Sequence, residues 1–341
     1  MDRIVLGKTK LEVNRLGLGG IPIQRVEEDE AVELVLHAVE RGIDFIDTSR
    51  VYSNSERRIG LALKQTQKRI VVASKSLARS SEGLRADLEK SLTEFDRNSV
   101  DLYQCHNIKA VSEYEQVISP GGALEAMIKA KEEGLIGHIG VSSHSLDMLD
   151  RILEDGFFET IMLCFSLLEH SAREKIIPKA MCKNVGVIAM KPFSGGVIEE
   201  TRLAMKYALS QPGIVVLAGV EYKQMLDQNW EIFQSSYDLD ASEMAEIEQI
   251  RKRFEKNFCR RCDYCQPCTE GIPIQYLMGL RSLVKRRGKG VLREGWIREA
   301  VDKGRNCSEC GLCLSRCPYE LPIPDLIKEN LQWADRELHE S

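Results

Sequence analysis

The chain has 341 residues, of which 43% are apolar and 29% charged, and its formal net charge is −5. This composition is typical of a folded globular protein with room for one large and one small domain. It argues against an integral membrane protein, because no run approaches the ~20 apolar residues of a spanning helix. The first residues also lack the apolar core of a signal peptide. We therefore expect a cytoplasmic protein with no membrane partner.

Residues 1–245 alternate short strands with amphipathic helices after a hairpin-like segment over 5–13. The predicted strands cover 15–20, 43–47, 70–75, 100–106, 138–142, 160–164, 186–190 and 214–218. The predicted helices that follow them lie around 30–40, 55–64, 84–95, 123–133, 145–154, 174–183, 201–210 and from 222 onward. Such alternation indicates an α/β fold with a parallel sheet, and eight units suit a closed (β/α)8 TIM barrel. An open doubly wound sheet is the competing fold, but no G-x-G-x-x-G motif follows the first strand.

Four polar side chains fall where predicted strands end. Asp47 ends the second strand and leads into Tyr52, Lys75 ends the third strand, and His106 ends the fourth. In a TIM barrel, functional groups collect at the C-terminal ends of the strands. Each residue also has a structural explanation, as a helix cap, a loop aromatic, a surface charge or a core imidazole. Their joint position at four expected strand ends favours a catalytic site.

These residues and their surroundings resemble the aldo/keto reductase superfamily. The similar stretches are Gly42–Tyr52, Ala73–Lys75, Asp101–His106, Gly134–Ser142 and Met190–Gly196. The resemblance implies hydride transfer between a nicotinamide and a small carbonyl or alcohol, with Tyr52 as the proton donor. It further implies that Lys75 lowers the pKa of Tyr52, that Asp47 keeps Lys75 charged, and that His106 donates to the carbonyl oxygen.

The resemblance is weaker at the cofactor site. The family holds the carboxamide with a Ser-Asn pair and a Gln, where this chain has Ser142-Ser143 and Met162. Around the last strand the resemblance implies nucleotide contacts from Gly219, Glu221 and Asn229. A carboxylate at 221 would repel a 2′-phosphate and accept from a ribose hydroxyl. We therefore expect NADH to be preferred over NADPH, although Lys223 could restore phosphate binding. A flavin and a loss of nucleotide binding both stay open.

Eight of the eleven cysteines form two runs near the C-terminus. The first run is Cys259, Cys262, Cys265 and Cys268, and the second is Cys307, Cys310, Cys313 and Cys317 followed by a proline. This spacing predicts two [4Fe-4S] clusters, in which the fourth cysteine of each run binds the other run's cluster. Structural zinc is the alternative, but zinc sites usually take paired knuckles and would leave cysteines over. Cys268 is the less secure ligand, because two residues precede it where three precede Cys317.

The cysteine runs predict a small, mainly helical dicluster ferredoxin-like domain over residues 246–341. With the barrel, this resembles the aldo/keto reductase subgroup that carries a C-terminal ferredoxin-like domain. Basic residues outnumber acidic ones in this segment, whereas the rest of the chain is acidic. The excess could balance the charge of the clusters or dock an acidic ferredoxin or similar electron carrier. Without interleaved aromatic residues, nucleic acid is not an expected partner.

Three functional hypotheses remain open. In the first, the clusters exchange electrons with a carrier while the barrel reduces or oxidises a small carbonyl or alcohol. In the second, the barrel is a nicotinamide-dependent reductase whose clusters are structural or redox-sensing. In the third, the protein transfers electrons or senses redox state on a barrel that no longer catalyses carbonyl reduction. The sequence does not predict the substrate, because the specificity loops carry no diagnostic residues.

Overall fold

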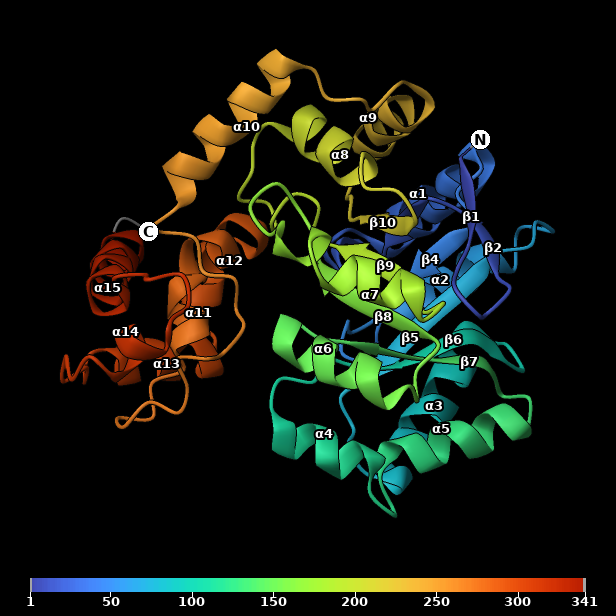
Figure 1. Cartoon of the computed structure of the whole chain (residues 1–341), viewed down its shortest axis with the longest axis horizontal. Helices are drawn as coiled ribbons and strands as arrows, with labels where there is room; N and C mark the ends of the chain where they lie inside the picture. The colour runs from blue at the N-terminus through green and yellow to red at the C-terminus, as the bar shows by residue number, and fades with distance from the viewer. Residues whose placement is uncertain (1, 340–341) are drawn as a thin grey trace. The chain divides into compact units, whose positions relative to one another are not determined.

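The computed structural model describes residues 2–339, with the side chain of Arg286 excepted, and Figure 1 shows the course of the chain. The chain forms two compact units. The first holds residues up to Ser194 together with Glu200–Asp240, and the second holds Gly195–Glu199 together with residues from Ala241 onward. The division therefore falls a few residues before position 246, because helix α10 (Ala241–Phe254) spans that position as one element.

The first unit is a closed barrel of eight parallel strands, as predicted. Its strands are β3 (Leu16–Gly19), β4 (Phe45–Asp47), β5 (Val71–Ser76), β6 (Val100–Cys105), β7 (Ile136–Ser142), β8 (Thr160–Cys164), β9 (Gly186–Met190) and β10 (Ile214–Ala218). Neighbours pair in chain order, and β10 closes the ring against β3. The strands are rich in apolar residues because both faces are covered, one by the barrel interior and the other by helices.

Helices surround the barrel because each presents one apolar stripe to the strands. They are α1 (Glu28–Arg41), α2 (Ser55–Leu63), α3 (Ser81–Phe95), α5 (Ala123–Glu132), α6 (Leu146–Asp155), α7 (Ile176–Cys182), α8 (Thr201–Leu209) and α9 (Lys223–Gln234). In α1 the stripe is Ala31, Leu34 and Val35, all buried. Gly42 ends α1 with φ +109°, a conformation that glycine adopts at low cost. The sequence prediction missed α4 (Val111–Ile118), whose short length leaves only two buried residues to reveal its period.

A hairpin closes the N-terminal end of the barrel. Strands β1 (Arg3–Val5) and β2 (Glu12–Asn14) pair antiparallel, in agreement with the predicted hairpin-like segment. Leu6 and Val13 are fully buried and join the interior cluster that holds Phe45, Leu102 and Met162. The barrel interior is therefore a packed core, and chemistry is confined to the opposite end of the strands.

The second unit is mainly helical. Besides α10 it contains α11 (Ile274–Met278), α12 (Leu280–Arg287), α13 (Gly295–Gly304), α14 (Leu312–Arg316) and α15 (Ile323–His339), with a 3-10 turn at Lys289–Arg293. Its core gathers apolar side chains from several of these helices, such as Leu277, Leu280, Ile297 and Ile327. Cysteines of both runs pack against this core. One small apolar core thus supports both cysteine runs.

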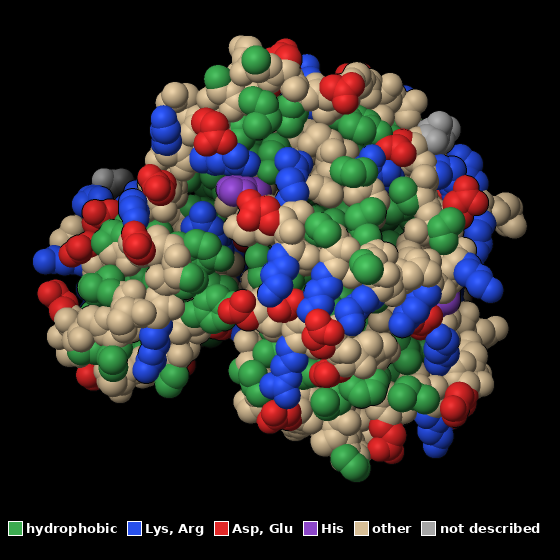
Figure 2. Space-filling model, in the orientation of Figure 1, with side chains coloured by type: hydrophobic (Ala, Val, Ile, Leu, Met, Phe, Trp, Pro, Cys, Tyr) green, Lys and Arg blue, Asp and Glu red, His purple; other side chains and the backbone are tan. Residues whose placement is uncertain are grey.

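Charged side chains of opposite sign are interleaved over the face of the molecule shown in Figure 2. Many form ion pairs within their own unit, such as Lys175 with Asp150 at 2.6 Å and Arg287 with Glu294 at 2.7 Å. Among residues 2–339 no helix is both long and apolar enough to cross a membrane.

Candidate active site and cysteine cavities

The mouth of the barrel brings together the four residues predicted at strand ends. Lys75 Nζ donates to Asp47 Oδ1 at 2.5 Å, and both side chains are almost completely buried. The ammonium lies 5.1 Å from the ring centre of Tyr52. The rings of Tyr52 and His106 meet edge to face, with their centres 5.9 Å apart. The carboxylate, the ammonium, the phenol and the imidazole therefore form a continuous row in which each group lies next to the following one.

The barrel register explains this convergence. Asp47 pairs with Ala73 across β4 and β5, and Lys75 pairs with Gln104 across β5 and β6. Parallel strands in this register end at the same side of the sheet, so the side chains that follow them face one mouth. Ser53 and Asn107, which directly follow Tyr52 and His106, have φ of +40° and +53°. Left-handed backbone at non-glycine residues is costly and gathers at functional sites.

Gln104 completes the surroundings of the buried ion pair. Its side-chain Nε2 donates to the second oxygen of Asp47 at 3.0 Å, and Lys75 Nζ also donates to the carbonyl of Thr48 at 2.6 Å. Burial raises the pKa of Asp47, while Lys75 and Gln104 act to lower it. Each hydrogen bond offsets part of the cost of removing two charges from water. Sequence reasoning missed Gln104, although it lies two residues before His106, a spacing that puts both on one face of an extended segment.

Burial dominates the protonation of Tyr52. It raises the pKa of the phenol, and the Lys75 ammonium only partly lowers it. Lys75 thus acts on this pKa in the expected direction, but desolvation of the phenolate outweighs the nearby cation, so the pKa is raised overall. Tyr52 consequently carries its proton at neutral pH, which is the form that can protonate an oxygen.

His106 is neutral at the same pH. Burial and the positive charges of Lys75, Lys191 and Arg79 hold the pKa of its imidazole well below the usual value. Its Nδ1 lies 2.9 Å from the hydroxyl oxygen of Ser49, a residue that sequence reasoning did not single out. A neutral imidazole donates from one nitrogen and accepts at the other, so this contact decides which nitrogen can donate.

The Ser49 hydroxyl has two acceptors within reach. Its oxygen lies 3.0 Å from the carbonyl of Lys75, but that carbonyl also accepts the backbone N–H of Arg50 at 3.0 Å. The hydroxyl can donate to only one of these two acceptors, because it carries a single hydrogen. When it donates to His106 Nδ1, the imidazole keeps its hydrogen on Nε2, where it can be donated to a ligand.

The two serines expected to hold a nicotinamide are engaged in local backbone contacts. Ser142 Oγ accepts from the backbone N–H of Asn107 at 2.8 Å, which leaves its own proton available to a ligand. Ser143 is fully buried, and its hydroxyl donates to the carbonyl of Ile108 at 2.6 Å. Ser143 therefore anchors a loop, and Ser142 is the better donor for a carboxamide.

The residues expected at the nucleotide end lie around the C-terminal end of β10. A Cβ on Gly219 would come within 3.0 Å of Pro22 Cγ, so two loops approach closely here. Arg25 Nε donates to the Glu221 carboxylate at 2.7 Å. The sequence analysis named only Lys223 as a cation for this region, and the structure adds Arg25, which comes from a distant loop. Asn229 is buried on α9.

Lys223 does not accompany Glu221 in this loop. Its ammonium donates to Glu33 on α1 at 2.7 Å. A lysine engaged on a neighbouring helix is a weaker candidate for phosphate binding than the sequence suggested, since it must first leave its carboxylate. The cation beside the predicted nucleotide contact is therefore Arg25.

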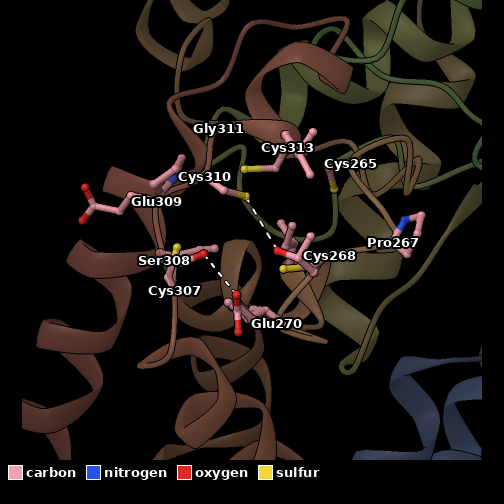
Figure 3. A pocket seen from close by; sticks show the side chains of 16 residues that line it. Cys265, Pro267, Cys268, Glu270, Cys307, Ser308, Glu309, Cys310, Gly311 and Cys313 are labelled. Carbon is pink, nitrogen blue, oxygen red and sulfur yellow. Dashed lines mark hydrogen bonds between the residues drawn. The ribbon is translucent and has the colours of Figure 1, made fainter.

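Two cavities of similar size lie in the second unit, and cysteines of both runs line each of them. The cavity in Figure 3 has an empty volume of about 400 Å³, part of which is open to solvent, and is lined by Cys268, Cys307, Cys310 and Cys313, with Cys265 also contributing. The other has an empty volume of about 350 Å³, also partly open to solvent, and is lined by Cys259, Cys262, Cys265 and Cys317. The fourth cysteine of each run thus reaches the cavity of the other run.

The environments of the thiols differ between the cavities. Burial raises the pKa of Cys259 to about 11 and that of Cys265 to about 12. Cys310 is exposed, and the backbone N–H of Leu312 and the Thr269 hydroxyl lower its pKa. Metal binding to the buried thiols must therefore displace protons.

Within residues 2–339, no three His, Cys, Asp or Glu side chains form a group that could hold a metal ion. A tetranuclear cluster sets a different requirement. Each of its four cysteines binds a different iron, so the sulfurs surround a cage instead of converging on one point. Four thiols spread around a cavity and backed by an apolar core meet this requirement.

Comparison with known proteins agrees with the barrel. The model of the aldo/keto reductase family matches residues 15–203. L-galactose dehydrogenase of Arabidopsis thaliana is 28% identical over 298 residues, which cover 72% of this chain and 92% of the plant protein. The structure of an aldo-keto reductase of Bacillus halodurans in its holo form is similar, with a TM-score of 0.65 and 22% sequence identity. The matched region covers 73% of this chain and 96% of the Bacillus halodurans chain. The structure of an aldo/keto reductase of Klebsiella pneumoniae in complex with NADPH is also similar, with a TM-score of 0.64 and 18% sequence identity. The matched region covers 74% of this chain and 95% of the Klebsiella pneumoniae chain.

The hydroxyl of Ser49 yields a prediction about His106. We expect wild-type His106 at pH 7 to be a single neutral tautomer with its hydrogen on Nε2, and Ser49→Ala to give a mixture of both tautomers. The ring-nitrogen chemical shifts of His106 in selectively labelled protein measure this directly. Ser49→Thr, which keeps the hydroxyl, should retain the wild-type pattern. Identical shifts in wild type and Ser49→Ala would show that Ser49 does not direct the proton.

Proposed function

The chain belongs to the aldo/keto reductase family, and from this premise we propose that it interconverts a small carbonyl compound and its alcohol with a nicotinamide nucleotide. The observation that carries the proposal is the chain of contacts from Asp47 through Lys75 and Tyr52 to His106 at the mouth of the barrel. Such a constellation supplies a proton donor and a hydrogen-bond donor to one oxygen.

Each of the four residues has a different role in the proposed reaction at the carbonyl oxygen. A bound dihydronicotinamide supplies the hydride that reduces the carbonyl carbon. Tyr52 gives its hydroxyl proton to the oxygen as negative charge develops there, and solvent later restores this proton. Lys75 stabilises the resulting phenolate, since its ammonium faces the phenol. His106 donates from Nε2 to the same oxygen, and Asp47 holds Lys75 in place.

A nicotinamide nucleotide fits the residues at the strand ends. The Klebsiella pneumoniae relative is described in complex with NADPH, which supports a nucleotide of this class. In this chain Ser142 can donate to the carboxamide, while Gly219, Glu221 and Asn229 surround the nucleotide end. Glu221 can accept from a ribose hydroxyl, and its ion pair with Arg25 keeps it oriented. We retain a preference for NADH over NADPH as part of the proposal.

The second unit is proposed to hold two [4Fe-4S] clusters with crossed ligation. One takes Cys259, Cys262, Cys265 and Cys317, and the other takes Cys268, Cys307, Cys310 and Cys313. The regular spacing and the two cavities lined by cysteines of both runs support this assignment. Such clusters carry single electrons, and assembly with free thiols is in keeping with a reducing cytoplasm.

An acidic ferredoxin-like carrier would be the electron partner of these clusters. The positive balance of the segment supports this choice, but several of its cations already face carboxylates. Lys256 lies 2.9 Å from Glu320, and Lys285 lies 2.8 Å from Glu199. Docking would therefore have to exchange existing ion pairs for new ones, and the carrier stays the least supported part of the proposal.

Electron transfer or redox sensing without carbonyl reduction is the second candidate function. Two observations favour it. Met162, aligned with the family's carboxamide-binding glutamine, is buried in the barrel core. Ser143, aligned with the family's asparagine, is engaged with the backbone. Both features weaken the nicotinamide site and leave the cysteine cavities unaffected.

Replacing Tyr52 with Phe tests carbonyl reduction. We expect kcat for small aldehydes to fall about 100-fold or more, because the proton donor is lost. The dissociation constant of the nucleotide should stay within about twofold, because the hydroxyl acts on the developing charge and not on ground-state binding. Steady-state kinetics and calorimetry measure the two quantities, with Tyr276→Phe in the second unit as the control. Turnover at the wild-type rate in Tyr52→Phe would exclude the proposed mechanism.

Replacing Glu221 with Gln tests the nucleotide preference. The change removes a negative charge and releases Arg25, so binding of NADPH relative to NADH should improve about tenfold or more. Calorimetric titration of both nucleotides gives this ratio, and Glu231→Gln on the exposed face of α9 is the matched control. A wild-type protein that already prefers NADPH contradicts the proposal. If wild type binds neither nucleotide, the second candidate function gains support.

Iron analysis tests the clusters. Anaerobically prepared protein should hold about eight irons per chain, as two tetranuclear clusters require. Cys317→Ser and Cys259→Ser should remove the same electron paramagnetic resonance signal, whereas Cys310→Ser and Cys268→Ser should remove the other one. Loss of the Cys310 signal in Cys317→Ser would instead indicate uncrossed ligation. Stoichiometric zinc with no iron after anaerobic reconstitution would eliminate the cluster proposal.

A further inference from the structure

The two cysteine runs have the same backbone conformation at equivalent positions. Because the first three cysteines are equally spaced in both runs, Arg261 is equivalent to Glu309, and Asp263 is equivalent to Gly311. The φ angles are +57° at Arg261 and +53° at Glu309, and they are +65° at Asp263 and +76° at Gly311. The runs are therefore structural repeats. The residue before the second cysteine carries opposite charges in the two repeats.

The charged side chains around the two cavities differ in the same sense. We call the cavity with three cysteines of the first run the first-run cavity, and the one with three cysteines of the second run the second-run cavity. The charged residues that line the first-run cavity are Arg260, Arg261 and Asp263. Those that line the second-run cavity are Glu270 and Glu309. The second-run cavity thus has acidic side chains where the first-run cavity has an excess of basic ones.

Arg261 places buried nitrogens beside the first-run cavity. Its Nε and Nη2 are buried and have no hydrogen-bond partner within residues 2–339. Its Nη1 lies against the backbone of Gly195 in the same unit, since a Cβ added there would come within 3.3 Å of it. Buried polar atoms without a partner are rare in folded proteins and call for an explanation, such as an ion held beside them. Thiolates that bind a cluster in this cavity would supply the missing negative charge.

The equivalent carboxylate has a different environment. Glu309 is exposed, and in Figure 3 its carboxylate is directed away from the labelled cysteines. Glu270 is also exposed, and its Oε1 accepts from the Ser308 hydroxyl at 3.2 Å. Water and salt screen exposed charges much more than buried ones. The electrostatic difference between the cavities therefore depends mainly on Arg261.

We infer that Arg261 raises the reduction potential of the cluster bound in the first-run cavity. The inference rests on the proposed clusters. A nearby cation favours the state with one more electron, and hydrogen bonds to the cluster sulfurs also influence the potential. Burial acts in the opposite direction, because less water surrounds the added charge. Arg261 thus offsets the cost of placing an electron in the less exposed of the two cavities.

The test is a redox titration of anaerobically reconstituted full-length protein with dithionite as the electron donor, followed by electron paramagnetic resonance. Arg261→Met and Arg261→Gln should each lower one midpoint potential. We expect a change of about tenfold or more in the one-electron equilibrium constant, which corresponds to about 59 mV. The affected signal should be the one that Cys259→Ser removes. Arg261→Lys, which keeps the charge, should retain most of the wild-type potential.

Two control variants separate this effect from a general change in surface charge. Glu309→Gln, at the equivalent position of the second run, should change the other midpoint potential by less than Arg261→Met changes the first. Arg298→Met, at an exposed position of α13 outside both cavity linings, should leave both potentials unchanged. Iron content is measured for each variant, so that a lost cluster is not mistaken for a shifted potential.

The possible failures are distinguishable. Unchanged potentials in Arg261→Met and Arg261→Gln, at wild-type iron content, would overturn the inference and leave the cluster proposal intact. A shift of the signal that Cys268→Ser removes would also overturn it, since Arg261 would then act on the wrong cavity. Wild-type protein that binds zinc and no iron would exclude the clusters themselves, and the inference would fall with them.

Discussion

The buried ion pair between Lys75 and Asp47 is the contact on which the candidate active site depends. Two charges removed from water are tolerated only if their remaining hydrogen-bonding groups are satisfied. Asp47 meets this condition through Lys75 and Gln104, and Lys75 through Asp47 and the carbonyl of Thr48. The pair fixes the ammonium beneath the ring of Tyr52, so the position of the proton donor follows from the cost of burying charge.

The cost of burying charge also determines the protonation states of the other side chains at the mouth of the barrel. Burial keeps Tyr52 protonated and His106 neutral, and each state is the one that can donate a hydrogen to an oxygen. The Ser49 hydroxyl contacts Nδ1 of the imidazole, so we expect it to influence which ring nitrogen keeps the hydrogen. Beyond the buried pair, Arg25 lies beside Glu221 at the expected nucleotide contact, so these two charges act there together.

If the cysteine cavities hold iron–sulfur clusters, the number of electrons moved in each step differs between the clusters and the barrel. Hydride transfer moves two electrons at once, whereas an iron–sulfur cluster moves one. A protein with both sites would need either two clusters acting in turn or clusters that do not take part in the barrel chemistry. Two cavities lined by cysteines would suit the first arrangement, and the apolar core shared by both cysteine runs would suit the second equally well.

The barrel and the predicted catalytic residues were accessible from sequence because both depend on local order. Alternation of strands and helices marks the units, and the chemistry of a TIM barrel lies at strand ends that can be located by counting. Asp47, Tyr52, Lys75 and His106 were found in this way. The short helix α4 was not, since eight residues contain too few turns to establish a helical period.

Contacts between distant segments were decided only by the tertiary structure. Arg25 and Glu221 are far apart in the chain and become an ion pair because β3 and β10 close the barrel. Lys191 and His144 follow different strands, β9 and β7, and their side chains lie 2.8 Å apart although no spacing in the sequence connects them. The protonation of Tyr52 also depended on the fold, because burial outweighed the neighbouring cation. Sequence alone determined which groups are present and where strands end, whereas only folding determined which charges face each other and how much water surrounds them.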